Sequence, residues 1–268
     1  MDLKAILNKF AQGHLSIDEV QKQISIHSIE YVRNNLAQLD MGREIRKGVP
    51  EVVFAEGKEY PDIVRIVLSA IRKKEKVMVS RIRRDELSKL CKDLKKRNLT
   101  LEIGKYSTTI LVSQENYHHH PTTRTGAKIG ILTAGTSDIG VAEEARLVAK
   151  AMGCDVIFRY DVGIAGIHRL FSPLEEMISK NVDAIVVVAG MEGALASIVA
   201  SIVDVPVIGV PTSIGYGFGS NGMAALASML QSCTFGLAVV NIDNGIGAGA
   251  YAATIANRMV LRGRKDKI

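Results

Sequence analysis

Short hydrophobic runs recur at regular intervals in the second half of the chain, separated by segments in which hydrophobic residues return every three or four positions. Runs without polar interruption are typical of parallel strands that are covered on both faces. The intervening segments, for example that of Val141, Ala145 and Val148, have the periodicity of helices with one apolar face. The pattern predicts strands at 129–133, 155–160, 184–188, 207–210 and 237–242, and helices at 138–152, 174–180, 192–203, 221–231 and from about 248. This alternation predicts an α/β fold with a doubly wound, flavodoxin-like parallel sheet, whose ligands gather at the carboxyl ends of the strands.

The first half of the chain predicts smaller elements. Ser16 and Glu19 have the spacing of a capping box, which opens a helix that turns Val20, Ile24 and Ile26 inward. After it we expect a strand within 48–57, a helix at 62–74, a strand at 77–82, a helix at 85–97 and a β pair across 99–112. The chain is therefore expected to comprise an N-terminal helical segment (1–46), a small α/β domain (47–116), a linker (117–126) and a larger domain (127–268).

Composition narrows the class of protein. The 268 residues are 47% hydrophobic, enough for a core, yet no apolar run approaches the roughly 20 residues of a membrane span. The residues after Met1 have an amphipathic pattern, which is not typical of a signal peptide. The three cysteines, Cys91, Cys154 and Cys233, are widely spaced and form no metal-type pair. These features favour a cytoplasmic protein with no membrane partner.

The positive charge is concentrated in residues 1–126, which hold 23 Lys and Arg against 16 Asp and Glu. The excess of basic residues is greatest between Arg72 and Arg97. An apolar stripe at helical spacing there leaves the lysines on the solvent-exposed face of the predicted helix. This stretch has no interleaved aromatic residues on which bases would stack. A solvated helix face is therefore favoured over a nucleic-acid surface, while attraction of an anionic substrate or an acidic partner stays open.

Several predicted strand ends carry residues suited to chemistry. The segment 133–138 combines a flexible turn, two hydroxyls and a helix start, which suits a phosphate or ribose as well as ordinary capping. Glu192 stands at a strand-to-helix junction, where a carboxylate can exchange a proton with a substrate or simply complement the helix dipole. The glycine-rich segment 211–222 suits either close approach to a phosphate or a mobile lid.

Cys233 precedes the last of these segments, 237–249, in which a strand leads through Asp243 and several glycines into a helix. A helix N-terminus close to the thiol would lower its pKa and make it a nucleophile. The alternative is a buried cysteine that serves as a small hydrophobe.

Half of the six histidines stand together as His118, His119 and His120 in the expected linker. Consecutive side chains point in different directions and rarely close one coordination sphere, so adventitious metal affinity is favoured over a nickel site.

Five ordered blocks of the sequence resemble the LarB family of nickel-pincer cofactor biosynthesis: 133–138, 160–163, 188–195, 205–212 and 239–245. With a further block at 50–57, the likeness covers most of the chain. The C-terminal half is also similar to the aminoimidazole ribonucleotide (AIR) carboxylases and mutases of purine synthesis, which share this fold. Those enzymes carry a catalytic His where this chain has Ala194, so the purine reaction is the disfavoured alternative.

The resemblance implies a carboxylase that is also a hydrolase. Nicotinic acid adenine dinucleotide would be carboxylated at the pyridinium C5, with CO2 or bicarbonate as co-substrate, and its phosphoanhydride cleaved to give pyridinium-3,5-biscarboxylic acid mononucleotide and AMP. The Cys233 thiolate would add to ring C4, and Glu192 would remove the C5 proton, with Asp243 as the competing base. Mg2+ or Mn2+ is expected to neutralise the diphosphate, although the sequence does not identify its ligands.

The resemblance and the strand-end positions also give candidates for substrate contact: Thr136, Ser137, Asp138, Asp161, His168, Gly190, Met191, Gly193 and Asn244. By analogy with the purine enzymes, the chain is expected to form a homo-oligomer, specifically an octamer. A third hypothesis is a nucleotide-binding module without catalysis, in which Cys233 is merely buried.

Overall fold

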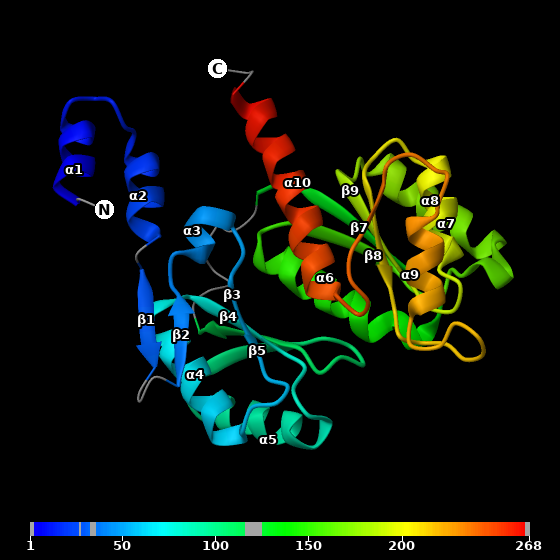
Figure 1. Cartoon of the computed structure of the whole chain (residues 1–268), viewed down its shortest axis with the longest axis horizontal. Helices are drawn as coiled ribbons and strands as arrows, with labels where there is room; N and C mark the ends of the chain where they lie inside the picture. Colours follow the sequence, from blue (N-terminus) through cyan, green and yellow to red (C-terminus); the bar gives the residue numbers. More distant parts are fainter. Residues whose placement is uncertain (1–2, 27, 33–35, 116–124, 266–268) are drawn as a thin grey trace. The chain divides into compact units, whose positions relative to one another are not determined.

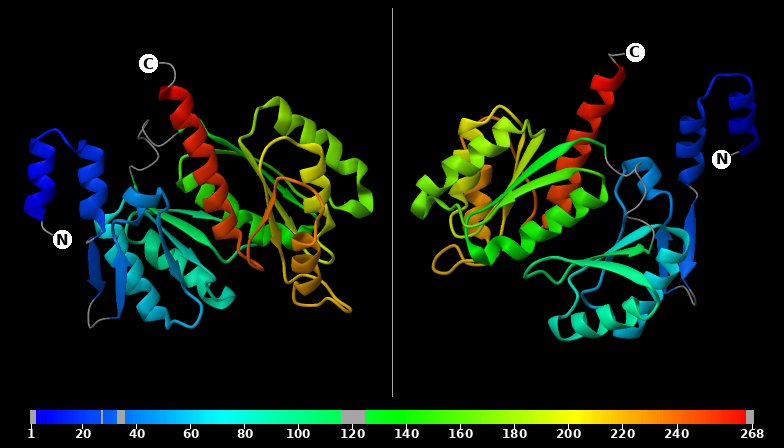
Figure 2. Two further views of the ribbon diagram at one scale, coloured as in Figure 1. Left: turned by 45° about the horizontal axis from the view of Figure 1, so that its top comes forward. Right: turned by 180° about the vertical axis from the view of Figure 1, so that it is seen from behind.

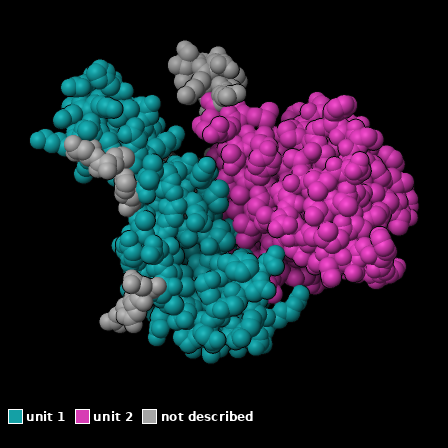
Figure 3. Space-filling model, viewed as in Figure 1, with its two compact units in different colours: residues 1–101, 111–118 teal, residues 102–110, 119–268 magenta. Residues whose placement is uncertain are grey.

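The computed structural model describes residues 3–26, 28–32, 36–115 and 125–265 (Figure 1). The chain divides into two compact units, one of residues 1–101 and 111–118, the other of residues 102–110 and 119–268 (Figure 3). The segment 102–110 thus groups with the second unit, whereas the sequence placed it within the small domain. The predicted linker and its three histidines lie almost wholly outside the described residues.

The second unit is built on a five-stranded parallel sheet in the order β11-β10-β9-β7-β8. Its strands are β7 (Lys128–Thr133), β8 (Asp155–Arg159), β9 (Ala184–Ala189), β10 (Val207–Pro211) and β11 (Leu237–Val239). Its helices are the 3-10 turns η4 (Thr136–Asp138) and η5 (Ile164–Gly166) and the α-helices α6 (Ile139–Ala151), α7 (His168–Ser179), α8 (Ala194–Ile202), α9 (Met223–Leu230) and α10 (Gly245–Lys265). The predicted doubly wound α/β fold is confirmed.

Helices cover the sheet on both faces (Figures 1 and 2). Side chains of α7, α8 and α9 form one core cluster with β7 and β9, while α6 and α10 pack together on the other side. Strands β9 and β10 are buried at every residue, which explains their unbroken apolar sequences. The chain leaves β7 for β8 on one side and returns to β9 on the other, so the strand order reverses between β7 and β9. A ligand crevice is expected at this switch point.

Three element boundaries differ most from the sequence prediction. Helix α7 begins at His168 instead of Leu174 and contains Pro173. Strand β11 ends at Val239 instead of Ile242, and α10 begins at Gly245, before the predicted Ala248. In the turn that follows β11, Asp243 adopts a left-handed conformation with φ 55°, and α10 begins two residues later.

Helices α6 and α10 lie side by side because glycines allow their backbones to approach (Figure 2). A Cβ atom at Gly245 would lie 2.1 Å from the carbonyl oxygen of Val141, and one at Gly249 would lie 2.4 Å from that of Ala145. These glycines therefore serve close packing within one chain.

Gly249→Ala is expected to lower the free energy of unfolding by about 1–3 kcal/mol, although alanine is the better helix former. The added methyl group meets backbone that has no rotamer to change, so the two helices must separate. Urea unfolding monitored by circular dichroism measures the loss. Arg258→Ala, at an exposed position of the same helix, is the control and should change stability by less than about 0.5 kcal/mol; equal stability of the two variants would contradict the packing argument.

A four-stranded sheet in the order β3-β4-β6-β5 belongs to the first unit, except for residues 102 and 103 of β5 and residue 110 of β6. Its elements are β3 (Glu51–Phe54), β4 (Lys76–Ser80), β5 (Leu99–Ile103) and β6 (Ile110–Gln114), with α3 (Arg43–Lys47), α4 (Tyr60–Lys73) and α5 (Arg84–Lys95). Strands β3 and β4 are parallel, as a βαβ connection requires.

The first 46 residues are not only helical. Helices α1 (Leu3–Ala11) and α2 (Ile17–Ser25) are followed by an antiparallel pair, β1 (Ile29–Val32) and β2 (Ala37–Asp40). The capping box of Ser16 and Glu19 is confirmed, and Val20 is buried. The prediction that Ile24 and Ile26 point inward is wrong, since they are 36% and 57% exposed. Helix α2 contacts α1 and α3, and these neighbours leave that face open. No described helix of the chain has both the length and the hydropathy that crossing a membrane requires.

Candidate functional site

A pocket of about 290 Å³ opens at the carboxyl ends of β7, β8 and β9, at the switch point of the sheet. Its walls are the loops that follow these three strands, together with Ile214 from the loop after β10. Of the predicted site residues it brings together six: Ser137, Asp138, Asp161, Gly190, Met191 and Glu192. The volume is near the lower end of the range of about 300–1,000 Å³ that is usual for ligand pockets.

Asp138 is the buried acid of the pocket, with 3% of its surface exposed. Its carboxylate accepts hydrogen bonds from the Thr212 hydroxyl at 2.7 Å and from the Gly135 backbone N–H at 2.8 Å. Burial raises the pKa of Asp138 and the nearby Asp243 carboxylate adds to this effect, while the hydrogen bonds oppose it. The side chain thus joins the loop after β7 to the loop after β10, so it organises the pocket in addition to lining it.

Asp161 lies at the mouth of the pocket and is paired with Arg169, whose Nη1 donates to Oδ2 at 2.7 Å. The backbone of Asp161 is left-handed, with φ 60°, and its N–H donates to the Thr133 hydroxyl at 3.0 Å. Because a non-glycine residue adopts this conformation only at a cost, the surrounding contacts must hold it there. The pair presents a guanidinium to the pocket that is suited to a phosphate or a carboxylate.

Glu192 follows β9 and is exposed at the pocket wall. It does not open α8 as predicted, because Gly193 takes the N-cap position with φ 66° and the helix begins at Ala194. Among the described residues no donor bonds the Glu192 carboxylate. Gly193 itself is buried against Ala225, where a Cβ would lie 2.9 Å from the carbonyl oxygen, so it shapes the loop and is absent from the pocket wall.

Asp243 and Asn244 do not line the pocket. The Asp243 carboxylate accepts the backbone N–H of Ser213 at 2.9 Å, which ties the end of β11 to the loop after β10. The Asn244 side chain accepts the N–H of Gly247 at 2.8 Å and so caps the start of α10. The structure therefore gives Asn244 a capping contact at the place where sequence reasoning had suggested substrate binding.

Cys233 lies in the connection from α9 to β11, at the amino end of the sheet. The carbonyl of Gly236, three residues later, accepts the N–H of Val207 at the first residue of β10. The pocket is at the carboxyl ends of the strands, roughly 15 Å away along strands that rise about 3.3 Å per residue. Strand β11 also separates Cys233 from the start of α10, contrary to the expectation that this helix end lies beside the thiol.

The thiol of Cys233 is nevertheless exposed, whereas Cys91 and Cys154 are buried. Burial raises the pKa of the Cys91 thiol, and burial aided by Asp183 raises that of Cys154 to about 12. Cys233 is therefore the accessible thiol among the three cysteines.

The remaining candidates lie at the rim or outside it. Thr136 and His168 are exposed and absent from the pocket wall, although each has a neighbour there, Ser137 and Arg169 respectively. Arg159, which sequence reasoning left between a phosphate contact and a surface ion pair, donates to Glu176.

Sequence reasoning missed Thr212 and Arg169. Thr212 is fully buried, and it bonds Asp138 across 74 positions of sequence. Its position directly after β10 could have indicated this contact, because the carboxyl ends of parallel strands lie together at one end of the sheet. Arg169 had no such signal, since its role depends on the left-handed turn at Asp161.

No group of three His, Cys, Asp or Glu side chains that would hold a metal ion occurs within the described ranges. Of the three pocket carboxylates, Asp138 is committed to Thr212 and Gly135 and Asp161 is paired with Arg169, so the pocket offers no preassembled metal cage. Mg2+ is commonly held by one or two carboxylates together with substrate phosphates, and Asp161 and Glu192 match only that mode.

Comparisons with known proteins match both units. Residues 128–264 match the family model for AIR carboxylase, and residues 31–114 match the LarB/PurE-like N-terminal domain. An uncharacterized protein of Methanocaldococcus jannaschii is 46% identical over 96% of this chain and 98% of its own length. N5-carboxyaminoimidazole ribonucleotide mutase of Thermotoga maritima is 31% identical over 48% of this chain and 74% of its own length. A crystal structure of Treponema denticola PurE2 aligns with 53% of this chain and 98% of its own, at 19% identity and a TM-score of 0.38.

Proposed function

Because the chain belongs to the LarB family and its C-terminal half is of the AIR carboxylase type, we propose that it carboxylates nicotinic acid adenine dinucleotide and hydrolyses its phosphoanhydride. The observation that carries the proposal is the pocket wall after β9. Glu192 is exposed there, and Ala194 lines the wall at the position that the resemblance matches to the catalytic His of the purine enzymes. The wall thus has a carboxylate base and lacks the purine proton carrier, which disfavours the mutase reaction.

The proposed chemistry reverses the polarity of the pyridinium ring. The Cys233 thiolate adds to ring C4 and gives a neutral dihydropyridine whose C5 is nucleophilic. C5 attacks the carbon of CO2, a base takes the C5 proton, and expulsion of the thiolate restores the aromatic cation with one new carboxylate. Glu192 is favoured over Asp243 as the base, because Asp243 is committed to the Ser213 N–H and does not line the pocket.

The pocket suits the pyridinium mononucleotide half of the substrate, since its 290 Å³ is small for a whole dinucleotide. The guanidinium of Arg169, which lines the pocket beside Asp161, would contact the diphosphate. Attack of water on the phosphoanhydride releases AMP. Bound Mg2+ would supply charge neutralisation on the diphosphate, with Asp161 at the mouth as its protein carboxylate, since Glu192 is assigned to the C5 proton.

The position of Cys233 at the amino end of the sheet means that the proposal requires the thiol of a second copy. The segment that carries it is open to such a copy, because Leu230 is 67% and Phe235 95% exposed in the single chain. A homo-oligomer in which this segment of one copy reaches the pocket of another would complete the site. The expected octamer contains such contacts only if its symmetry brings these two surfaces together.

Complementation between two inactive variants tests this requirement. Cys233→Ser and Glu192→Gln are each expected to be inactive, and the randomly mixed protein formed by their equal co-expression should regain about a quarter of the wild-type activity. In a hybrid, one site combines the intact pocket of one copy with the intact thiol of the other. Hybrids as inactive as the parents would place both residues in one copy and contradict the shared site.

Mass spectrometry tests the reaction itself. Protein incubated with nicotinic acid adenine dinucleotide, bicarbonate and Mg2+ should yield AMP and a mononucleotide that carries one additional carboxyl group. With 13C-bicarbonate the mononucleotide should gain one further mass unit, since one carbon enters. Turnover of aminoimidazole ribonucleotide in place of the dinucleotide would support the mutase instead.

A further inference from the structure

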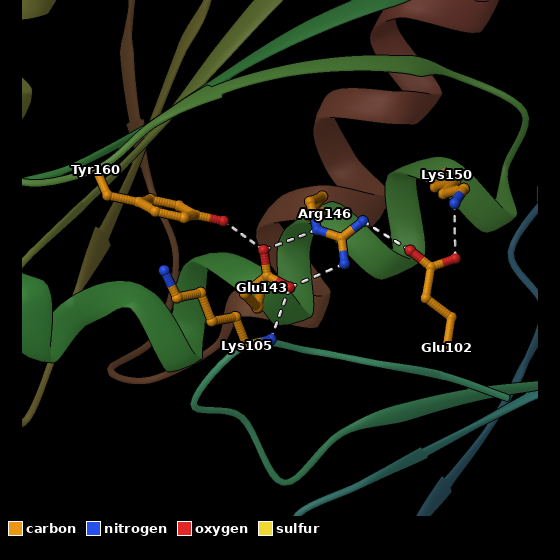
Figure 4. Close-up of polar contacts among 6 residues, drawn as sticks. All are labelled: Glu102, Lys105, Glu143, Arg146, Lys150 and Tyr160. Atoms are coloured by element: carbon orange, nitrogen blue, oxygen red, sulfur yellow. Dashed lines mark hydrogen bonds and ion pairs between the residues drawn. The ribbon is translucent and has the colours of Figure 1, made fainter.

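A partly buried network of charged side chains joins α6 to the segment 102–110, which belongs to the same unit (Figure 4). At its centre is Glu143, with 3% of its surface exposed. The Glu143 carboxylate accepts Nε and Nη2 of Arg146 at 2.7 and 2.9 Å, the backbone N–H of Lys105 at 2.8 Å, and the hydroxyl of Tyr160. Arg146 in turn donates to Glu102 at 2.8 Å, and Lys150 donates to Glu102 at 2.7 Å.

The protonation states of the network are fixed by its own contacts. Burial favours a neutral Glu143, but the hydrogen bonds from Arg146, Tyr160 and Lys105 outweigh it and hold the pKa of Glu143 below its ordinary value. Burial and the bond to Glu143 raise the pKa of Tyr160. The Tyr160 hydroxyl therefore stays protonated near neutral pH and donates to a carboxylate.

The segment 102–110 packs directly against α6, which holds the network's partners in place. A Cβ at Gly104 would be 3.1 Å from Cβ of Glu143, and a Cβ at Gly140 would be 3.0 Å from the carbonyl oxygen of Tyr106. The Thr109 hydroxyl also donates to Glu144 at 3.0 Å. Close backbone approach and a direct hydrogen bond hold the two elements together.

Tyr160 connects this segment to the pocket, since it is the residue directly before Asp161, which lines the pocket. Beyond it, the backbone N–H groups of Asp161 and Val162 are held by the Thr133 side chain and carbonyl at 3.0 and 2.9 Å. The Tyr160 ring is stacked on Phe158 with centroids 5.2 Å apart, and its hydroxyl reaches Glu143. The left-handed Asp161 is thus fixed from Thr133 on one side and from Glu143, through Tyr160, on the other.

An ionic network of this kind contributes little net free energy to folding, because desolvation of the charges offsets most of their attraction. Its hydrogen bonds are directional, however, and they fix the position of the Tyr160 side chain more closely than apolar packing would. We propose that Glu143 and Tyr160 are positioning residues that set the Asp161–Arg169 pair at the pocket mouth for an anionic nucleotide. The identity of that nucleotide rests on the proposed function; the mechanical role does not.

Tyr160→Phe tests the proposal, because it removes the hydroxyl and keeps the ring. Hydrogen exchange of the backbone amides in 161–166 should become at least about tenfold faster in the ligand-free variant, as expected for loss of a hydrogen bond to a charged group. The calorimetric Kd for nicotinic acid adenine dinucleotide should rise by a similar factor.

Tyr60→Phe is the matched control. Tyr60 is also a partly buried tyrosine whose hydroxyl donates to a carboxylate, that of Asp93 at 2.7 Å, but it lies in the first unit. It should leave both readouts unchanged. Exchange in 161–166 that matches the control, or that rises equally throughout the chain, would overturn the positioning role. Faster local exchange in a protein that binds no dinucleotide, wild type included, would support that role and reject the proposed function.

Discussion

Cys233→Ser is expected to lower product formation at least on the order of a thousandfold, as removal of a covalent nucleophile does in other enzymes. A serine hydroxyl stays protonated at neutral pH, so the pyridinium keeps its positive charge and its C5 cannot attack CO2. Binding of the dinucleotide should be nearly unchanged, because the pocket wall of each copy contains no part of residue 233. The carboxylated mononucleotide is quantified by mass spectrometry, and binding by calorimetry.

Cys91→Ser is the matched control for this variant, since Cys91 is buried on α5 in the first unit and should leave turnover unchanged. Alkylation adds an independent readout, because Cys233 is the one exposed thiol of the three. In the oligomer that completes the site, the dinucleotide should protect it from alkylation. Normal turnover by Cys233→Ser would eliminate the covalent mechanism, and alkylation that the dinucleotide does not slow would favour the non-catalytic module.

For Glu192→Gln we expect kcat to fall by about 10²–10⁴-fold, the usual contribution of a general base. Glutamine keeps the shape of the side chain but cannot take the C5 proton. Addition of the thiolate to the ring needs no proton transfer from C5, so the cysteinyl adduct should still form. Intact-protein mass spectrometry after rapid quenching should therefore detect the adduct on Glu192→Gln and not on Cys233→Ser.

Two further carboxylates separate the role of Glu192 from a general charge effect. Glu175→Gln removes an exposed acid from α7, outside the pocket, and should leave kcat unchanged. Asp243→Asn retains an oxygen that can accept the Ser213 N–H, so its effect should be well below that of Glu192→Gln. The reverse order of the two losses would assign the base to Asp243.

The fold was accessible from sequence because its signals are local. The unbroken apolar strands such as 184–188 and the helical stripe of Val141, Ala145 and Val148 report burial within one element. Their alternation is compatible with few topologies, since parallel strands need helical crossovers. The same reasoning placed Asp138 and Glu192 in one pocket, because the ends of β7 and β9 are neighbours in such a sheet.

The sequence by itself thus determined the layered α/β fold, the carboxyl end of the sheet as the place of the pocket, and three of its acids, Asp138, Asp161 and Glu192. Only the tertiary structure decided that Thr212 holds Asp138, that Arg169 pairs with Asp161, that the segment 102–110 supports Tyr160, and that Cys233 enters the sheet at the opposite end. The physical reason is range. Hydrophobic periodicity and capping involve residues a few positions apart, whereas these contacts join residues far apart in sequence or depend on backbone turns that no local pattern encodes.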